Sequence, residues 1–265
     1  MIDIRRALAG LVAAAIVAAC APGGAQAAFV NDDFSDLDDT ANPAWTHLNG
    51  LVNSTGQTWD ASTGQYRLVA PNNGFALPPG GKLGFVGSYT GPLSTDVRVS
   101  ADFVQNSTGA AYGIGARLNG ASGVGAINNF NSLVGYAYAY EPFAAGGLGE
   151  MVLYKIQGAS LNDIGSQQVT LDVANKDYRF VLEVVGNQLH GQVFEIGGGM
   201  VAERFATDSA YASGYSGVFG YSAEARVVPT DFTIDNFRTG IPEPAAGLLM
   251  AASTGALALA RRRRN

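Results

Sequence analysis

Three tyrosines alternate with alanines at Tyr136, Tyr138 and Tyr140. In an extended strand such residues point to one face, with neighbouring rings roughly 6.6–7 Å apart. Aromatic faces stack against sugar rings, and the tyrosine hydroxyl adds a hydrogen-bonding group. The three tyrosines are therefore candidate ligand-binding residues for a carbohydrate. The alternative is that they line a buried core or form a cross-strand ladder.

Five aspartates lie within a short stretch near the start of the chain, at Asp32, Asp33, Asp36, Asp38 and Asp39. Calcium takes about six to eight oxygen ligands and tolerates varied geometry. The carboxylates are therefore candidate ligands for a structural calcium ion, although the spacing lacks the Gly and terminal Glu of an EF-hand loop. The alternative is a solvated acidic segment.

Residues that commonly carry hydrolytic chemistry are present without a recognisable spacing. A retaining glycosidase needs two carboxyl groups about 5–5.5 Å apart, but each glutamate between residues 28 and 240 lacks an acidic residue two positions away. No Gly-x-Ser-x-Gly motif occurs, and His47 and His190 have no motif around them. The sequence therefore favours a protein that is not an enzyme. Carboxylates that converge from separate strands leave a glycosidase or lyase open as an alternative.

Alternation of apolar and polar residues predicts the strands that must position these side chains. Residues 97–103 place apolar side chains on one face, and segments 180–185 and 189–196 flank Gly186-Asn187, a hairpin signal. The other candidate strands are 29–34, 44–48, 56–60, 65–70, 83–89, 110–118, 132–140, 150–157, 167–173, 216–222 and 232–235. Residues 119–131, rich in Gly and Asn, are predicted to form a surface loop. About a dozen short strands predict an all-β, antiparallel jelly-roll sandwich over residues 28–240.

The same region resembles the concanavalin A-like, laminin-G-like jelly rolls. The matching pieces are Asp32-Asp33-Phe34, Trp45, Trp59, Gly64-Gln65-Tyr66, Tyr178-Arg179-Phe180, Gly217-Val218-Phe219-Gly220 and Ile234-Asp235-Asn236-Phe237. In that class the first and last strands pair. The resemblance therefore implies that Asp235 lies near Asp32 and Asp33 and joins them as a candidate calcium ligand. Because such jelly rolls include lectins and glycosidases, the fold does not decide the function.

Charge and cysteine content exclude several classes of protein. Residues 28–240 carry 20 of the 22 acidic residues and 10 of the 16 basic ones. This acidic balance argues against nucleic acid as a partner, because nucleic acid needs a basic surface. A single cysteine excludes a disulfide framework and a multi-cysteine metal site.

Residues 1–27 have the pattern of an export signal peptide. Arg5 and Arg6 precede the apolar segment Ala7–Ala19, which is too short to span a membrane. Ala25-Gln26-Ala27 then offers a small-x-small cleavage site. A second possibility is lipoprotein processing, in which cleavage precedes Cys20 and lipid is attached to its thiol.

The C-terminal residues 241–265 have the pattern of a second targeting segment. Pro242, Glu243 and Pro244 precede the uncharged segment Ala245–Ala260. Its 16 residues would form a transmembrane helix of about 24 Å, short against a hydrocarbon core of ~30 Å. The arginine cluster that follows is expected to stay on the cytoplasmic side; it comprises Arg261, Arg262, Arg263 and Arg264.

This tail resembles a PEP-CTERM sorting signal in the order and spacing of its three parts. The resemblance implies export in a Gram-negative bacterium, transient anchoring in the inner membrane and recognition by an exosortase-type protease. It also implies that the tail is removed and that the protein reaches the cell surface or extracellular matrix. An ordinary tail anchor would not account for the Pro-Glu-Pro motif.

The sequence therefore favours an exported, non-enzymatic surface protein whose jelly-roll domain is a candidate binder of extracellular polysaccharide. A secreted glycosidase or lyase and a purely structural matrix protein remain the alternatives. Two carboxyl groups in one groove would favour the enzyme, and exposed tyrosines would favour carbohydrate binding.

Overall fold

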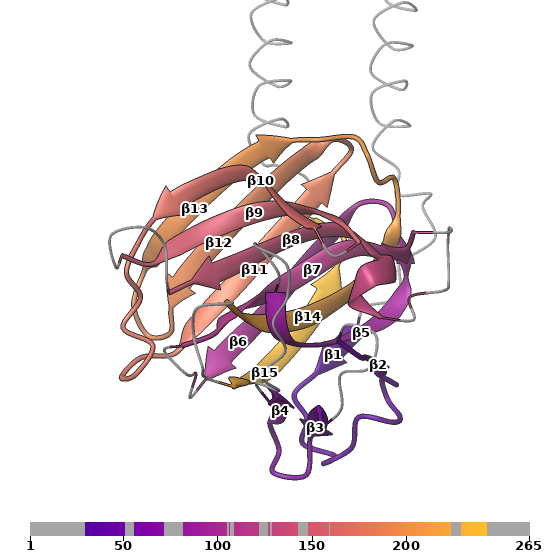
Figure 1. The fold of residues 1–265 in the computed structure, drawn as a ribbon, viewed down its shortest axis with the longest axis vertical. Coiled ribbons are helices and arrows are strands. Elements are labelled where there is room, and N and C mark those ends of the chain that lie inside the picture. The colour runs from indigo at the N-terminus through magenta and orange to yellow at the C-terminus, as the bar shows by residue number, and fades with distance from the viewer. Residues whose placement is uncertain are drawn as a thin grey trace, which may run out of the picture.

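The computed structural model describes residues 30–50, 56–71, 82–104, 106, 109–121, 127, 129–142, 148–158, 160–223 and 229–242. These residues form an all-β sandwich of two antiparallel sheets, consistent with the predicted jelly roll (Figure 1). Sheet A contains, in spatial order, β13 (Met200–Thr207), β12 (Gln188–Glu195), β11 (Tyr178–Val185), β6 (Val97–Val104), β15 (Thr230–Gly240), β4 (Tyr66–Ala70) and β3 (Thr58–Asp60), and β1 (Val30–Asp32) also pairs with β15. Sheet B contains β10 (Ser160–Gln168), β9 (Glu150–Gln157), β8 (Leu133–Glu141), β7 (Ala111–Gly120), β14 (Gly214–Ala223), β5 (Lys82–Ser94) and β2 (Thr46–Leu48).

The signal segment 1–27 with Cys20, and the tail from Glu243 to Asn265, lie outside the described residues. Pro242 is the last described residue, just after β15. Among the described residues, no helix is long and apolar enough to span a membrane.

Most predicted strands are present, including the hairpin in which Gly186, with φ of 56°, turns the chain from β11 into β12. Two strands differ. β10 spans 160–168 instead of 167–173, and β13 was not predicted at all. These strands are the outer strands of the two sheets at the same end of the sandwich (Figure 1). Their backbones meet there, and the Glu203 backbone N–H donates to Gln167 Oε1 at 3.2 Å.

The three alternating tyrosines of β8 belong to the core between the two sheets. Tyr136, Tyr138 and Tyr140 are 0%, 0% and 2% exposed, so the predicted exposed carbohydrate platform is wrong. The physical reason is the register of β8, whose tyrosines point toward sheet A while its alanines point outward. Tyr138 fills the space above Gly191 of β12, where an added Cβ would lie 2.6 Å from the Tyr138 ring.

A second apolar cluster covers the outer face of sheet B. The Phe85 and Phe130 rings stack with centroids 4.0 Å apart, and Ile127 is also buried there. Phe130 begins the 3-10 helix Phe130–Ser132 and is fully buried. The end of the predicted surface loop 119–131 therefore packs onto the outer face of sheet B. Among the described residues, no comparable apolar cluster lies on the outer face of sheet A.

Two of the core tyrosines, Tyr136 and Tyr138, should respond differently to loss of their hydroxyl groups. Tyr138 Oη has no hydrogen-bond partner among the described residues, whereas Tyr136 Oη donates to Asp208 and accepts from the Tyr211 backbone N–H. In urea unfolding, Tyr138→Phe should leave the unfolding free energy unchanged or raise it, because it removes a buried hydroxyl without a partner, while Tyr136→Phe should cost about 1–2 kcal/mol. Tyr138→Ala should cost roughly 3–5 kcal/mol because it leaves a cavity. Near-wild-type stability of Tyr138→Ala would contradict this packing.

Candidate functional site

Asp32 holds a core tryptophan in place. Its Oδ2 accepts from Trp45 Nε1 at 2.7 Å and its Oδ1 accepts from the Phe34 backbone N–H at 2.8 Å. The residue is 5% exposed, and burial raises the pKa of its carboxyl group. Both oxygens are thus occupied: Oδ2 fixes Trp45, which packs edge-on against Phe237 at 4.7 Å, and Oδ1 holds the backbone at Phe34.

The other predicted calcium ligands do not join Asp32 in a metal site. β1 and β15 pair, as the resemblance implied, with Asp32 opposite Phe237. However, Asp33 caps a turn by accepting from the Ser35 backbone N–H at 3.1 Å, and Asp235 accepts from the Asn236 backbone N–H at 2.7 Å. Within the described ranges, no three acidic, histidine or cysteine side chains are grouped closely enough to hold a metal ion.

Asp32→Ala should therefore lower stability in a way that calcium does not affect. The substitution leaves the Trp45 indole N–H unpaired, and it should cost about 1.5–3 kcal/mol in unfolding free energy. The control Asp36→Ala removes an exposed acceptor from the same acidic run and should change stability by about 0.5 kcal/mol or less. Melting curves should be the same in calcium and in chelator. A calcium-dependent rise in melting temperature that Asp32→Ala abolishes would restore the metal hypothesis.

The outer face of sheet A carries three cross-strand rows of side chains, set by the register of β6, β11, β12 and β13. The first row is Asp102, Arg179, Phe194 and Met200; the middle row is Ser100, Val181, Gln192 and Glu203; the third row is Arg98, Glu183, His190 and Phe205. The outer rows are four residues apart along β6, β11 and β12, roughly 13 Å, and five residues apart along β13, where the register shifts. The middle row has short side chains on β6 and β11, so it lies lower than the rows on either side.

The third row is a continuous chain of contacts. Arg98 forms an ion pair with Glu183, and His190 Nδ1 lies 3.8 Å from Glu183 Oε2. His190 Nε2 lies 2.8 Å from Glu203 Oε1, and its ring stacks on Phe205 with centroids 4.1 Å apart. Every charged group in this row therefore has a fixed partner.

In the first row, Arg179 and Asp102 form a bidentate ion pair. Arg179 Nε and Nη2 donate to the two carboxylate oxygens of Asp102 at 2.6 and 2.8 Å. This pairing raises the pKa of the Arg179 guanidinium. Asn236 Nδ2 also donates to Asp102, at 3.2 Å. The plane of the Arg179 guanidinium is thereby held in one orientation.

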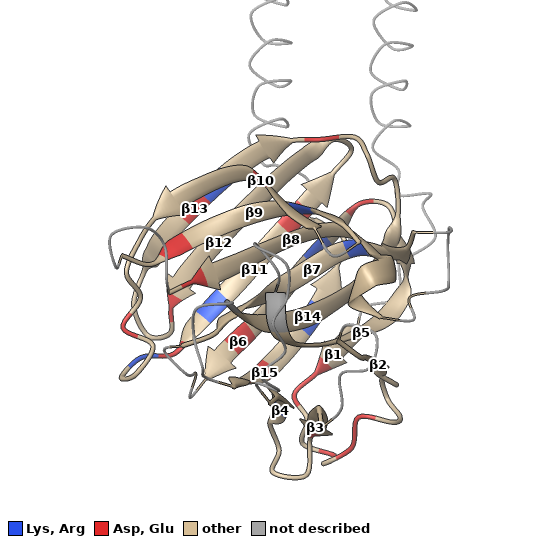
Figure 2. Ribbon diagram, viewed as in Figure 1, with Lys and Arg blue, Asp and Glu red and all other residues tan. Residues whose placement is uncertain are grey.

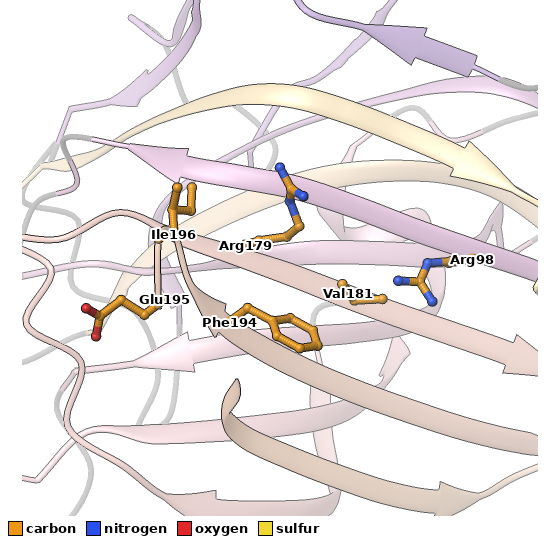
Figure 3. A pocket seen from close by; sticks show the side chains of 7 residues that line it. Arg98, Arg179, Val181, Phe194, Glu195 and Ile196 are labelled. Atoms are coloured by element: carbon orange, nitrogen blue, oxygen red, sulfur yellow. The ribbon is translucent and has the colours of Figure 1, made fainter. Parts of the chain in front are cut away.

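A groove of about 330 Å³ extends from Arg98 over Val181, past Arg179 and Phe194, to the turn that follows β12. Its lining consists of Arg98, Arg179, Val181, Phe194, Glu195, Ile196 and Gly197. Figure 3 shows Val181 between the two arginines, with the Phe194 ring beside it. Basic and acidic residues lie side by side on these strands (Figure 2). The groove therefore offers oriented hydrogen-bond donors and an apolar ring without a strong net charge.

Each arginine retains donors that the described residues do not use. An arginine side chain has five N–H bonds. Arg98 uses one of them on Glu183 and Arg179 uses two on Asp102. The remaining N–H groups can donate to hydroxyl or carboxylate oxygens of a ligand in the groove.

Sequence reasoning did not identify this site. Arg98 and Arg179 lie at polar positions of strands that were correctly predicted, but the polar face of a strand is solvated by default. The grouping of these residues becomes visible only from the register between strands, which places Arg98 opposite Glu183 and Arg179 opposite Asp102. A list of the outward residues on each strand would have contained the candidates but not their grouping.

A pair of glutamates meets on the outer face of sheet B. Glu141 of β8 lies directly opposite Glu150 of β9. Glu141 Oε1 accepts hydrogen bonds from the hydroxyls of Tyr154 and Tyr221. This is the one place among the described residues where two glutamates face each other across neighbouring strands.

The likeness to solved structures agrees with the architecture. No family model matches the sequence, and no curated protein matches it. A Bacillus subtilis protein of unknown function with a galectin-like fold is 13% identical, with a TM-score of 0.55 over 82% of this chain and 96% of that chain. The basic winged bean lectin, solved with Tn-antigen, is 10% identical, with a TM-score of 0.53 over 82% and 100% of the two chains. At these identities the likeness establishes a lectin-like jelly-roll fold.

Proposed function

We propose that this protein binds carbohydrate without hydrolysing it, through the groove on the outer face of sheet A. The observation that carries the proposal is the pair of oriented arginines, Arg98 and Arg179, beside the Phe194 ring. Sugars present hydroxyl groups for hydrogen bonds and an apolar ring face, and this combination of groups is suited to both. The lectin that shares this fold is known with a bound sugar antigen, which supports the same class of ligand here.

Ion pairs that exist before the ligand arrives reduce the entropy that binding costs. Holding a long side chain in one rotamer costs about 0.5–1.5 kcal/mol on association. Asp102 and Glu183 already orient Arg179 and Arg98. The same pairing argues against catalysis in this groove, because each carboxylate there faces a cation, including Glu195 with Lys176 at 2.9 Å. No carboxylate in the groove is left to act as a general acid.

The assignment of the groove as the carbohydrate site can be tested by replacing two arginines that form similar ion pairs, one inside the groove and one outside it. Arg98→Ala and Phe194→Ala should weaken glycan binding by roughly fivefold or more, the effect of losing one hydrogen bond or ring contact. Arg67→Ala is the matched control, because Arg67 pairs with Asp231 on the same sheet but does not line the groove. Residues 28–240 would be screened on a glycan array, and affinities of the hits measured by calorimetry. An equal loss in all three variants would contradict the assignment of the groove.

A glycosidase is the second candidate, and it is favoured by one observation: Glu141 and Glu150 lie opposite each other beside two tyrosine hydroxyls. A retaining mechanism needs two carboxyl groups about 5–5.5 Å apart, and the Cβ atoms of directly opposite strand residues lie about 4.5–5.5 Å apart. Release of shorter sugars from the bound glycans, lost in both Glu141→Gln and Glu150→Gln, would establish this function instead. Absence of both glycan binding and glycan cleavage would favour the third alternative, a structural matrix protein.

We also propose that the chain is exported and sorted as a PEP-CTERM protein, by an exosortase-type protease, to the cell surface or extracellular matrix. The support is the order of Pro242-Glu243-Pro244, the apolar segment 245–260 and the arginine cluster 261–264. Signal peptidase would remove residues 1–27, unless lipoprotein processing at Cys20 intervenes.

The sorting proposal predicts the mass of the mature protein. Protein recovered from the surface of the native host should begin at Ala28 and lack the residues after about Pro244. Intact mass spectrometry measures both ends at once, and deletion of the exosortase-type protease gives the unprocessed control. Surface protein that still carries Arg261–Arg264 would contradict the proposal. A diacylglycerol-modified Cys20 would replace cleavage after Ala27 with lipoprotein processing.

A further inference from the structure

Three residues that line the groove lie on one diagonal across β6, β11 and β12. Arg98 is opposite Glu183, and Val181 lies two residues before Glu183 on β11. Val181 is in turn opposite Gln192, and Phe194 lies two residues further along β12. Diagonal neighbours of this kind are roughly 7–8 Å apart, within reach of long and aromatic side chains. The Arg98 guanidinium and the Phe194 ring therefore border the space above Val181 from opposite sides (Figure 3).

The apolar surface of the groove is small. Val181 is 1% exposed and forms the floor beneath the longer side chains that line the groove with it. The half-buried Phe194 ring and Ile196, which is 45% exposed, supply the accessible apolar atoms. This surface suits contact with a small apolar substituent of a sugar, such as a methyl group, as well as with a ring face.

The polar side chains that line the groove offer it hydrogen-bond donors. They are Arg98, Arg179 and Glu195, and an arginine side chain has no acceptor. Glu195 Oε2 accepts from Lys176 Nζ at 2.9 Å, and Figure 3 shows the Glu195 carboxylate pointing away from Val181. A ligand group that only accepts hydrogen bonds therefore matches this lining better than a hydroxyl group, whose own O–H needs an acceptor.

The charges around the groove favour an acceptor that is neutral. Arg98 is paired with Glu183, and Arg179 is paired with Asp102. A ligand carboxylate would be attracted by each arginine and repelled by the carboxylate that the arginine already contacts, so the net attraction is small. A carbonyl oxygen accepts hydrogen bonds without carrying a charge. An acetyl group places a methyl group directly beside such an oxygen, and so matches both the donors and the apolar surface.

We propose that the groove selects sugars that carry an acetyl group, as an N-acetyl amide or an O-acetyl ester. The inference rests on the proposed function and adds the class of sugar. The acetyl carbonyl oxygen accepts from an N–H of Arg98 that the ion pair with Glu183 does not use. The acetyl methyl group packs against the Phe194 ring above Val181, and Arg179 donates to hydroxyl oxygens of the same sugar.

The test compares ligands that differ only in acetylation. The purified protein would be titrated by calorimetry with diacetylchitobiose and cellobiose for the amide, and with acetylated and deacetylated xylo-oligosaccharides for the ester. Any array hit that carries acetyl groups would be titrated before and after their removal. In at least one of these pairs the acetylated ligand should bind about tenfold more tightly or better.

Two results would overturn the inference. One is that the members of every pair bind within about threefold of each other. The other is that an oligogalacturonate, whose acceptors are carboxylates, binds more tightly than every acetylated ligand.

Single substitutions locate the acetyl group in the groove. Arg98→Ala should reduce the affinity ratio of acetylated to non-acetylated ligand to about threefold or less, and Phe194→Ala should lower the ratio in the same direction. Arg179→Ala should weaken both ligands and leave the ratio unchanged. Arg67→Ala, outside the groove, is the control and should change neither affinity. Urea unfolding of each variant verifies that it is folded. An unchanged ratio in both Arg98→Ala and Phe194→Ala would overturn the proposed contacts.

The outcomes separate the two proposals. Equal affinity within every pair, weakened by Arg98→Ala, keeps the groove as a carbohydrate site and rejects the selection of acetyl groups. A preference for acetylated ligands whose affinity neither Arg98→Ala nor Phe194→Ala changes rejects the groove itself. Absence of binding to any array glycan and to any of these oligosaccharides rejects both proposals.

Discussion

The contact between Tyr138 and Gly191 determines how the two sheets fit together. A Cβ at position 191 would lie 2.6 Å from the tyrosine ring, so the ring can occupy the core only where β12 presents a glycine. Strand residues alternate between faces, and a slip of one residue would move every side chain to the other face. The glycine therefore also fixes which residues of β12 point outward, namely His190, Gln192 and Phe194. The ligand-facing surface thus follows from packing on the opposite side of the sheet.

Cross-strand ion pairs have two consequences for the outer face of sheet A. Arg98 with Glu183 and Arg179 with Asp102 join β6 to β11 at two points, four residues apart on each strand. Partly exposed pairs contribute little to stability, about 0–1 kcal/mol each. Their larger consequence is local neutrality: the domain is acidic overall, yet the groove presents arginines without an excess of either charge. Such a surface is suited to uncharged, hydroxyl-rich molecules.

The sequence predicted the fold well and the candidate site poorly, for reasons that particular residues show. Residues 97–103 and 180–185 alternate clearly because one of their faces is buried. β13 was missed because its Phe205 points outward while Glu203 and Arg204 interrupt the pattern. Alternation at 136–140 predicted a shared face for the tyrosines correctly, but it could not tell which face is buried. The pairing of β1 with β15 followed from the resemblance alone, since no local pattern contains a contact between residues 30 and 239.

The position of β15 has a mechanical consequence. This strand lies directly beside β6, with Gly240 opposite Arg98, and the described C-terminal segment ends at Pro242, two residues after it. Tension between a molecule held at Arg98 and the C-terminal end of the domain would therefore cross a single strand interface. Because β15 is long and antiparallel to both β6 and β4, a pull along its axis would strain many backbone hydrogen bonds at once. Because Phe232, Ile234 and Phe237 of β15 also belong to the core, such a pull would be resisted by the backbone hydrogen bonds and by core packing together.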